Sequence, residues 1–346
     1  MRNYSNCWIT LNRQCNLRCE WCYARDTNFR LEDDANIDTV FKIIDICVEK
    51  KIKHITLIGG EPTLYKNLDQ VVKKIKENDI KCGIVTNGLK LADKDYLKKL
   101  MELGIDSFSI SLKGENEKVF KQVSGYDGFY KVMQAIKNCS EENASFSVSM
   151  VLTNDNIPSF INGLDAAQKF GAKSFHLSFC YDFNMNSVVK NPLALDEIVT
   201  LPEKFQSCYD DLCKRINNRF SLFQTLPLCL WDEQFIKKMI DDKKVTSICQ
   251  LLSDKGLLFD TEGNMIPCNA MYRLKLGKLG VDYNDGTTLD SFRNSEKIQR
   301  VYNKLRGVPS QECLECKKLK YCGGGCVCQW TNFNFQQIKK YIKEEI

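Results

Sequence analysis

Residues 8–22 of the 346-residue chain have the sequence Trp-Ile-Thr-Leu-Asn-Arg-Gln-Cys-Asn-Leu-Arg-Cys-Glu-Trp-Cys. The stretch begins with a short apolar run, residues 8–12, that is typical of a buried strand. Three cysteines follow at C-x3-C-x2-C spacing, Cys15, Cys19 and Cys22. In a series of β-then-α units, the loop after the first strand lies at the carboxyl end of the strands, where active sites collect. Three thiolates at this spacing suit a cubane iron–sulfur cluster that keeps one iron open for a ligand.

A zinc site and three free thiols on a loop are the two alternatives for this triplet. A structural zinc site needs a fourth protein ligand. The chain has only two histidines, His54 and His176, so the supply of such a ligand is small.

Short apolar strands alternate with amphipathic helices through the first half of the chain. Six such units predict a parallel sheet with right-handed crossovers, and we expect it to curl into a partial (β/α)6 TIM-like barrel. An open doubly wound sheet is the alternative, because periodicity does not separate the two. Strands are expected at 8–12, 54–58, 83–86, 107–112, 146–152 and 174–179. Helices are expected at 37–51, 68–78, 94–103, 128–139 and 157–170.

The pattern changes after residue 179. Residues 181–191 are polar and irregular, and residues 195–220 and 231–244 have helical patterns. Residues 257–260 and 265–267 flank a turn and predict a small β-hairpin. We therefore expect four regions: a partial barrel, a helical linker region, a small cysteine-rich domain, and a tail or capping helix, at 1–185, 186–248, 249–330 and 331–346.

Cysteine is the unusual component, with 18 of 346 residues. The net charge is only +5, with basic and acidic residues interleaved, so no nucleic-acid partner is expected. No apolar run reaches the roughly 18 residues of a membrane span, and the polar N-terminus has no signal peptide. We therefore expect no membrane partner and a cytoplasmic location, where clustered cysteines indicate metal or redox chemistry.

The triplet resembles the defining CxxxCxxC motif of the radical SAM superfamily, whose last cysteine follows an aromatic residue, here Trp21. The run Gly59-Gly60-Glu61-Pro62 at the end of the second expected strand matches the GGEP motif of that family. The resemblance implies a [4Fe-4S] cluster on the three cysteines. It also implies that Gly59, Gly60 and Glu61 hold the methionyl amino end of S-adenosyl-L-methionine.

Further positions match the family's cofactor-binding strands. Thr86 and Asn87 end the third expected strand, and Ser109 and Ser111 lie in the fourth. The resemblance implies that they line the polar end and ribose of S-adenosylmethionine, because ribose hydroxyls pair with Ser and Asn side chains. Lys113, Asn154 and Asn156 are weaker candidates of the same kind, and Tyr23 is a candidate for the adenine.

The resemblance also implies an activity. The open iron binds S-adenosylmethionine, an electron from the reduced cluster breaks a C–S bond, and a 5′-deoxyadenosyl radical abstracts hydrogen from an unactivated carbon. The protein positions the reactants and excludes water, while the cofactor supplies the difficult chemistry. We expect the enzyme to be sensitive to air, because its open cluster can be reached by solvent, and therefore to be active only under anaerobic conditions.

A second cysteine array has C-x2-C-x5-C-x3-C-x-C spacing and follows Cys249 and a Gly-x4-Cys pair. A zinc ribbon is the structural alternative, but seven cysteines exceed one zinc site. The array resembles the SPASM extension of radical SAM enzymes, which implies auxiliary [4Fe-4S] clusters. By family topology one cluster takes Cys249, Cys268 and Cys326. The other takes Cys313, Cys316, Cys322 and Cys328.

Two features depart from the SPASM pattern. The last cysteine, Cys328, follows after one residue instead of a longer gap, and the only candidate for an extra upstream ligand is Cys229. A twitch-type arrangement with one auxiliary cluster stays open. Seven other cysteines are expected to be structural. Among them Cys180, after the sixth expected strand, is a candidate hydrogen-atom donor to a substrate radical.

The leading hypothesis is a radical SAM enzyme that modifies a peptide or protein by thioether or carbon–carbon crosslinking, epimerisation or side-chain oxidation. The first cluster cysteine is residue 15, so no peptide-recognition domain is expected before the barrel, and a leader-binding protein would be a separate partner. A low-potential flavodoxin or ferredoxin is the expected electron donor. The alternatives are a small-molecule radical dehydrogenase or lyase, and a non-catalytic iron–sulfur or zinc-binding interaction protein.

Overall fold

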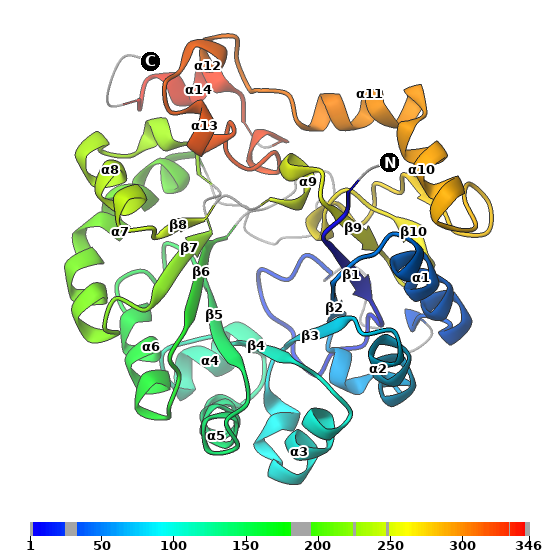
Figure 1. Ribbon diagram of the computed structural model, residues 1–346. Coiled ribbons are helices and arrows are strands. Elements are labelled where there is room, and N and C mark those ends of the chain that lie inside the picture. The colour runs from blue at the N-terminus through cyan, green and yellow to red at the C-terminus, as the bar shows by residue number, and fades with distance from the viewer. Residues whose placement is uncertain are drawn as a thin grey trace.

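One curved β-sheet organises the chain in the computed structural model, which describes residues 3–24, 33–180, 195–223, 226–246, 249–331 and 333–342 (Figure 1). Within these residues the sheet has 11 strands in the order β11-β10-β9-β1-β2-β3-β4-β5-β6-β7-β8. The strands are β1 (Asn6–Thr10), β2 (His54–Ile58), β3 (Lys81–Thr86), β4 (Ser107–Ser111), β5 (Phe146–Leu152), β6 (Phe175–Phe179), β7 (Phe220–Phe223), β8 (Val245–Thr246), β9 (Gly256–Phe259), β10 (Asn264–Met265) and β11 (Gly277–Lys278).

The order of the strands decides between the two predicted architectures. Strands β1 to β8 follow one another as parallel neighbours, without the reversal of order that defines a doubly wound sheet. Strand β8 is not paired with β11, so the barrel is not closed. The predicted partial barrel is confirmed, and all six of its predicted strands are present.

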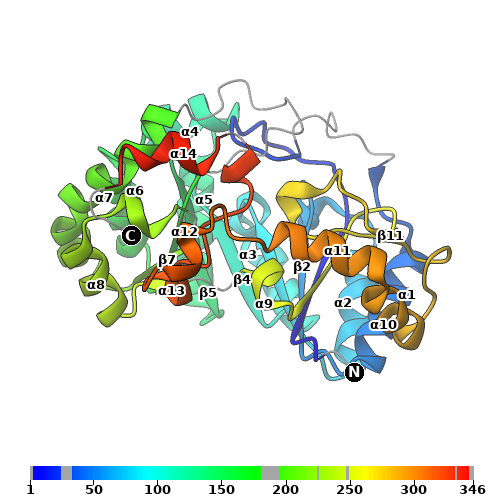
Figure 2. The ribbon, with the colours of Figure 1, turned by 90° about the horizontal axis from the view of Figure 1, so that it is seen from above.

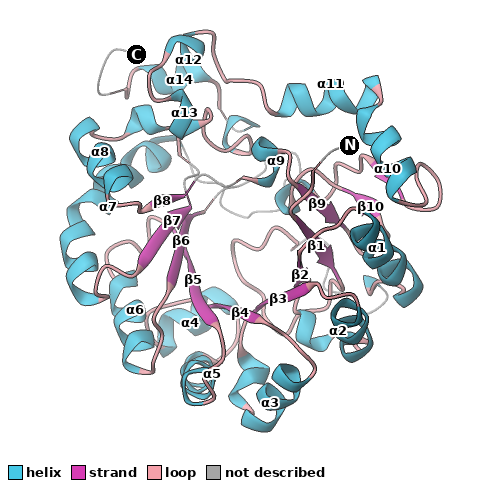
Figure 3. Ribbon diagram, viewed as in Figure 1, coloured by secondary structure: helices cyan, strands magenta, loops and turns pink. Residues whose placement is uncertain are grey.

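Helices form a layer outside the curved sheet (Figures 1 and 3). Helices α1 to α6 connect the six strands β1 to β6, with α4 and α5 both following β4. Asn36 and Asn116 cap α1 and α4 through their side chains. The helices are α1 (Ile37–Glu49), α2 (Leu68–Glu77), α3 (Lys94–Glu102), α4 (Glu117–Ser124), α5 (Phe129–Glu141), α6 (Phe160–Lys169), α7 (Leu195–Arg215), α8 (Glu233–Asp241), α9 (Gln250–Ser253), α10 (Gly286–Asn294), α11 (Glu296–Leu305), α12 (Glu312–Glu315), α13 (Leu319–Cys322) and α14 (Phe335–Lys339). Short 3-10 turns are η3 (Pro62–Leu64), η4 (Leu89–Ala92), η6 (Leu228–Leu230), η7 (Asn269–Met271) and η8 (Gln329–Thr331).

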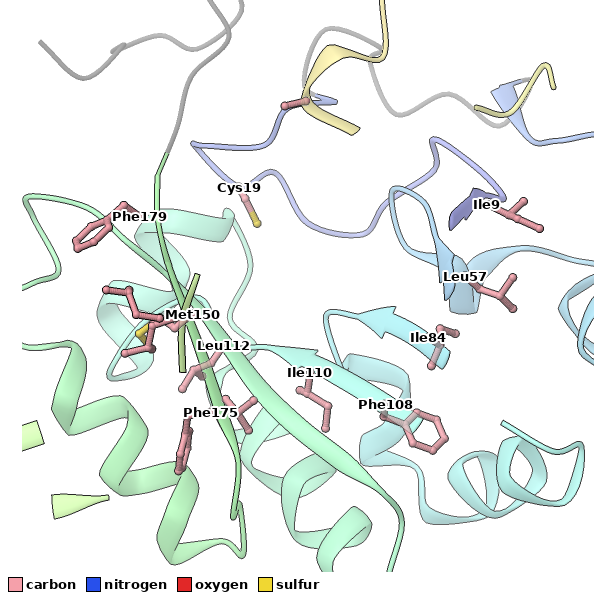
Figure 4. Packing of buried hydrophobic residues seen from close by; sticks show 14 of the residues in the cluster. Ile9, Cys19, Leu57, Ile84, Phe108, Ile110, Leu112, Met150, Phe175 and Phe179 are labelled. Carbon is pink, nitrogen blue, oxygen red and sulfur yellow. The ribbon is translucent and has the colours of Figure 1, made fainter. Parts of the chain in front are cut away.

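The alternation of residues along the strands separates the core from the concave face. In β4, Phe108 and Ile110 are buried, while the serines between them are half-buried. Figure 4 shows both apolar side chains pointing toward the helices, as do those of Ile9 and Phe175 on other strands. Because successive side chains of a strand point to opposite faces, the serines face the inside of the curve. A closed TIM barrel fills this space with bulky apolar residues, whereas here it contains the serines of β4 together with larger side chains such as Trp8 and His176.

The C-terminal segment runs across the opening between the two edges of the sheet (Figures 1 and 2). At one end α10 contacts α1, where the Glu49 carboxylate accepts a hydrogen bond of 2.6 Å from the Gly286 backbone N–H. At the other end α13 meets η6, where the Leu228 N–H donates to the Cys322 sulfur at 3.3 Å. The segment therefore closes over the concave face.

The region between residues 186 and 248 contains more than the predicted helices. Strands β7 and β8 lie within it and continue the sheet beyond β6. Phe220, the last residue of a predicted helix, instead begins β7, and α7 ends at Arg215. The predicted hairpin is present as β9 and β10, and β9 pairs in parallel with β1.

Some predictions fall on residues that the structure does not describe. The boundary at 185/186, the whole irregular stretch 181–191 and the last residues of the tail lie outside the described ranges. Of the tail, residues 333–342 are described and contain α14. No helix in the described part of the chain is both long enough and apolar enough to cross a membrane.

Candidate functional site

The N-terminal cysteine triplet lies on the loop that follows β1, as predicted. Figure 4 shows Cys19 on this loop, on the side of the sheet opposite the outward-pointing core residues. Cys19 is buried, and Cys15 and Cys22 are half-buried. The Leu17 N–H donates to the Cys15 sulfur at 3.4 Å, and the Ala24 N–H donates to Cys22. Such N–H···S bonds are one means by which proteins stabilise and tune iron–sulfur clusters.

The chemistry of the three donors fits an iron–sulfur cluster. Burial, with smaller contributions from the charges of Glu61, Cys19 and Cys22, raises the pKa of the Cys15 thiol to about 12. Burial also raises the pKa of Cys22, against which Lys113 and Arg13 act as nearby positive charges. The metal-free thiols of Cys15 and Cys22 are therefore protonated near neutral pH, and binding of iron releases their protons. Three soft sulfur donors on one loop suit a cluster with one open iron.

The two glycines of the GGEP motif allow the cluster loop to pack directly on the end of β2. A Cβ atom on Gly59 would lie 2.1 Å from the Asn12 Oδ1, and one on Gly60 would lie 2.4 Å from the Arg13 and Gln14 carbonyl oxygens. The Gly60 N–H donates to the Asn12 carbonyl at 2.9 Å. The close backbone approach here is between two loops of the chain itself.

Glu61 is a buried carboxylate, 1% exposed, that joins the ends of β2 and β3. Its Oε1 accepts hydrogen bonds from the Thr63 and Thr86 hydroxyls, both at 2.7 Å, and its Oε2 accepts one from the Asn87 N–H at 2.7 Å. Burial raises the pKa of this carboxyl, and these donors act in the opposite direction. The carboxylate oxygens are thus engaged by the chain's own donors.

Asn87 extends this network to the cluster loop. Its side-chain Nδ2 donates to the Asn16 Oδ1 at 2.7 Å, and its Oδ1 accepts from the Leu89 N–H at 3.0 Å. Asn16 lies between the first two cysteines of the triplet. The ends of β2 and β3 and the cluster loop are therefore one hydrogen-bonded unit.

The remaining predicted cofactor residues lie at several places. Ser109 and Ser111 are half-buried on β4, and the Ser111 hydroxyl is 3.3 Å from that of Ser149. The Asn154 Oδ1 accepts from Lys204 at 2.7 Å, and its Nδ2 is buried without a hydrogen-bond partner. Asn156 is used by its own turn, where its side chain pairs with the Thr153 N–H and the Val151 carbonyl.

Arg13 is a buried residue of the cluster loop, 4% exposed, whose role the sequence analysis missed. Its guanidinium lies 4.8 Å from the centre of the Tyr272 ring. It also hydrogen-bonds with Tyr23, whose pKa is raised by burial to about 12. One guanidinium nitrogen, Nη1, is buried without a hydrogen-bond partner. Tyr23, like Trp21, is half-buried, and its ring lies 6.3 Å from that of Tyr272.

A cavity of about 400 Å³ lies between the concave face and the C-terminal segment. Strand residues on its wall include Trp8, Ser149, His176 and Ser178. His176 lines this cavity, and its Nδ1 is 2.7 Å from the Ser221 hydroxyl. Cys180 is buried directly after β6 and is not among the residues that line this cavity.

Residues 9–165 match the family model of the Radical SAM superfamily. This region of the chain is a radical SAM domain. The matched range contains β1 to β5, the cysteine triplet and the GGEP motif. A curated relative, the probable GTP 3',8-cyclase of Sulfurisphaera tokodaii, is 31% identical over 180 residues, which are 51% of this chain and 56% of the relative. The chain thus spans about half the length of the curated relatives it matches.

The radical SAM chain also resembles solved structures over nearly its whole length. SuiB of Streptococcus suis, bound to the precursor peptide SuiA, has a TM-score of 0.72 at 16% identity, covering 99% of this chain and 75% of SuiB. Native anSMEcpe with bound AdoMet and a Cp18Cys peptide has a TM-score of 0.71 at 18% identity, covering 97% and 95%. At these identities the likeness shows a common fold, including the C-terminal region that the family model does not match.

The C-terminal cysteines of this radical SAM chain fall into two groups. Cys249, Cys268, Cys326 and Cys328 line the large cavity. A second cavity, of about 30 Å³, is lined by Cys229, Cys313, Cys316 and Cys322. Cys322 also reaches the wall of the first. The structure thus places Cys328 beside the first predicted ligand set and not beside the second.

Electrostatic interactions follow the same division. Burial, with smaller contributions from Cys322, Cys313 and Cys316, raises the pKa of Cys229 to about 12. Cys328 instead interacts with Cys268 and Cys326, and hydrogen bonds with these two thiols raise its pKa.

Among the described residues, no group of three or more His, Cys, Asp or Glu side chains has a geometry that could hold one metal ion.

Proposed function

We propose that this chain cleaves S-adenosylmethionine reductively and uses the resulting 5′-deoxyadenosyl radical to abstract a hydrogen atom from a peptide or protein. The observation that supports this most directly is the position of Cys15, Cys19 and Cys22. Three buried or half-buried thiols lie on the loop after β1. This loop adjoins the concave face of the sheet, which the cysteine-rich segment covers.

Cys15, Cys19 and Cys22 would hold a [4Fe-4S] cluster, and the C-terminal cysteines would hold auxiliary clusters in a SPASM-like domain at residues 249–330. When bound, the cluster supplies one electron to S-adenosylmethionine, whose sulfur–C5′ bond breaks to give methionine and the 5′-deoxyadenosyl radical. The radical then takes a hydrogen atom from the substrate, forming 5′-deoxyadenosine and a substrate radical. A flavodoxin or ferredoxin would restore the electron.

The chain's own residues position the reactants. Glu61 and Asn87 hold the ends of β2 and β3 against the cluster loop through the bonds described above. Because the Glu61 carboxylate is fully engaged, its part in binding S-adenosylmethionine is to fix the backbone of Gly59 and Gly60. Thr86 supports that carboxylate through the hydrogen bond that its hydroxyl donates.

The other contacts of S-adenosylmethionine are assigned to side chains near the cluster loop and on the concave face. Ser109 and Ser111 face the ribose, Tyr23 and Trp21 lie near the adenine, and Asn154 offers an unpaired buried Nδ2 group. Cys180 lies at the carboxyl end of β6, at the same edge of the sheet as the cluster loop. It remains our candidate hydrogen-atom donor.

A peptide or protein substrate is favoured by the resemblance of the whole chain, C-terminal region included, to structures of SuiB and anSMEcpe with bound peptides. A separate leader-binding protein would then be a further partner. The second candidate is a small-molecule reaction, which the relatives named as GTP 3',8-cyclases favour. These relatives match about half of the chain, whereas the peptide-bound structures cover nearly all of it.

Anaerobic incubation with S-adenosylmethionine and dithionite tests the proposal. The wild type should release 5′-deoxyadenosine only when the reductant is present, and Cys19→Ala should reduce this release to background. Cys208→Ala is the matched control, because this half-buried thiol lies on α7 and bonds to the Phe205 carbonyl. Equal release from Cys19→Ala and the wild type would refute the assignment.

The choice of substrate class has its own measurement. A cysteine-containing peptide substrate should increase the yield of 5′-deoxyadenosine and emerge with an altered mass, whereas GTP should have no effect. Stimulation by GTP alone would favour the small-molecule reaction.

A further inference from the structure

The C-terminal cysteines present a problem of pairing. Family topology joins Cys328 to Cys313, Cys316 and Cys322, but Cys328 is fully buried and hydrogen-bonds with Cys268 and Cys326. The cavity bordered by the other three is completed by Cys229, which lies far upstream on η6.

The position of Cys229 is fixed by the core. Its neighbours Leu228 and Leu230 are fully buried in the main hydrophobic cluster, and so is Trp231 directly after the turn. Trp231 packs against Phe235 of α8 with ring centres 5.9 Å apart. A one-turn helix anchored on both sides in this way has little freedom to move its remaining side chain. Cys229 is therefore held at the surface of the core that the C-terminal segment covers.

The C-terminal segment is fitted closely to this turn. The Leu228 N–H donates to the Cys322 sulfur at 3.3 Å, which joins η6 to α13. A Cβ atom on Gly325 would lie 3.2 Å from the Pro227 nitrogen, and this glycine also has a φ of +79°. Only glycine adopts this backbone readily at such a close approach. The segment that contains Cys322 and Cys326 is thus built to lie against η6.

We propose that Cys229 is the fourth ligand of the auxiliary cluster held by Cys313, Cys316 and Cys322. Cys328 is then the fourth ligand of the cluster held by Cys249, Cys268 and Cys326. This inference rests on the proposed function, because it takes the C-terminal cysteines as iron–sulfur ligands. Eight cysteines divide into two sets of four, as two cubane clusters require. Neither auxiliary cluster then has an open iron, so only the N-terminal cluster binds a small ligand through iron.

The experiment counts iron and acid-labile sulfide in chains that lack the N-terminal cluster. The starting variant is Cys15→Ala/Cys19→Ala/Cys22→Ala, which should retain about eight irons per chain in two auxiliary clusters. Further replacement of Cys313, Cys316 and Cys322 by alanine leaves only the first auxiliary cluster, with about four irons. Replacement of Cys249, Cys268 and Cys326 instead leaves only the second.

In each of these two backgrounds, replacing the fourth ligand of the remaining cluster should weaken that cluster. Cys229→Ala should lower the iron content or shift the EPR signal of the reduced protein only where the second cluster remains. Cys328→Ala should do so only where the first remains. Cys208→Ala should change neither. The opposite dependence on Cys229 and Cys328 would overturn the inference and leave the proposed function standing.

Failure of the proposed auxiliary clusters has a different signature. If the starting variant binds no iron at all, the C-terminal cysteines are not cluster ligands, and this part of the proposed function is wrong.

A second measurement uses only the wild-type chain. Dibromobimane joins neighbouring thiols in the metal-free wild-type chain, and mass spectrometry of the digest identifies the joined pairs. Cys229 should be joined to Cys313, Cys316 or Cys322, and Cys328 to Cys268 or Cys326. Joining of Cys328 to Cys313 or Cys316 in place of these pairs would contradict the inference.

Discussion

Gly60 has no side chain, which allows the cluster loop to pack directly against the end of β2. Alanine at this position would place its Cβ 2.4 Å from the carbonyl oxygens of Arg13 and Gln14, so the loop would have to shift. Forcing extra atoms into a packed site typically costs about 1–3 kcal/mol. Gly60→Ala should therefore lower the free energy of unfolding of the metal-free chain by about that amount in urea titrations.

The chain offers a matched glycine as the control for this prediction. A Cβ on Gly307 would meet its nearest atoms at 3.4 Å and 3.5 Å, which is ordinary van der Waals contact. Gly307→Ala should change the free energy of unfolding by less than about 0.5 kcal/mol. Equal effects of the two substitutions would show that the contact between the GGEP turn and the cluster loop is not tight.

A second prediction concerns the hydrogen bonds of the Glu61 carboxylate, where the first concerned steric fit. Its two carboxylate oxygens accept from Thr63, Thr86 and Asn87. In Glu61→Gln, one oxygen becomes an NH₂ group that faces a donor, so at least one buried donor loses its partner. The cost of such a loss is about 1–3 kcal/mol. We expect this decrease in the free energy of unfolding, measured in urea on the metal-free chain.

The exposed Glu77 on α2 provides the comparison, because its side chain is 62% exposed and its ion pair with Lys73 spans 4.0 Å. Glu77→Gln should be close to neutral, since exposed ion pairs contribute little. If Glu61→Gln were as mild as Glu77→Gln, the carboxylate network would not be what joins β2 and β3.

At the scale of elements, Asp106 ties α2 and β3 to the start of β4. Its Oδ2 accepts from Lys76 at 2.8 Å and from the Cys82 N–H at 2.6 Å. Burial alone would raise the pKa of this carboxyl, but these two hydrogen bonds lower it below its usual value of 3.8. Because the folded-state pKa is the lower one, Asp106 stabilises the fold above the unfolded-state pKa, and this contribution is lost as pH falls through the folded-state pKa.

The resulting prediction is a pH-dependent difference between two proteins. At pH 7, Asp106→Asn should be less stable than the wild type by no more than about 1 kcal/mol, since the Asp106 side chain is 36% exposed and its ion pair is screened by solvent. The difference should shrink as the pH falls through and below about 4. Urea titrations of both proteins at a series of pH values measure it. A difference that grew toward low pH would contradict the assigned direction of the pKa shift.

The elements that the sequence predicted are those whose pattern is local and long enough to recognise. The alternation Ser-Phe-Ser-Ile-Ser in β4 identifies a strand with one polar face, and the six-unit barrel followed from such runs. Strands β7 and β8 were missed because they have four and two residues, too few to show a period. The pairing of β9 with β1 was not predicted either, since partners so distant in sequence leave no local pattern.

The site was predictable to the same extent. The triplet and the GGEP motif were found because short spacings deliver neighbouring ligands to one place. The partners of Glu61 come from two strands, so its engagement by Thr86 and Asn87 required the fold. The same reason explains why Cys229 was left uncertain. Its place beside Cys322 depends on how the C-terminal segment crosses the open barrel.

At the scale of the whole molecule, the open barrel and its covering segment form one enclosure. The C-terminal segment is docked on α1 at one edge of the sheet and on η6 at the other. The cluster loop, the large cavity and the two groups of C-terminal cysteines all lie beneath or within it. This arrangement leaves a cavity inside the curve, where a complete barrel would be filled with apolar side chains.

The number of irons bound per chain tests whether the cluster loop and both groups of C-terminal cysteines hold clusters. After anaerobic reconstitution, the wild type should contain about twelve irons per chain, and Cys15→Ala/Cys19→Ala/Cys22→Ala should contain about eight. The fall measures the N-terminal cluster, and the remainder measures the auxiliary ones. A fall from about eight to about four would leave a single auxiliary cluster, and then one of the two cysteine groups would be structural. No fall would mean that the loop after β1 holds no cluster, and the radical mechanism would lose its source of electrons.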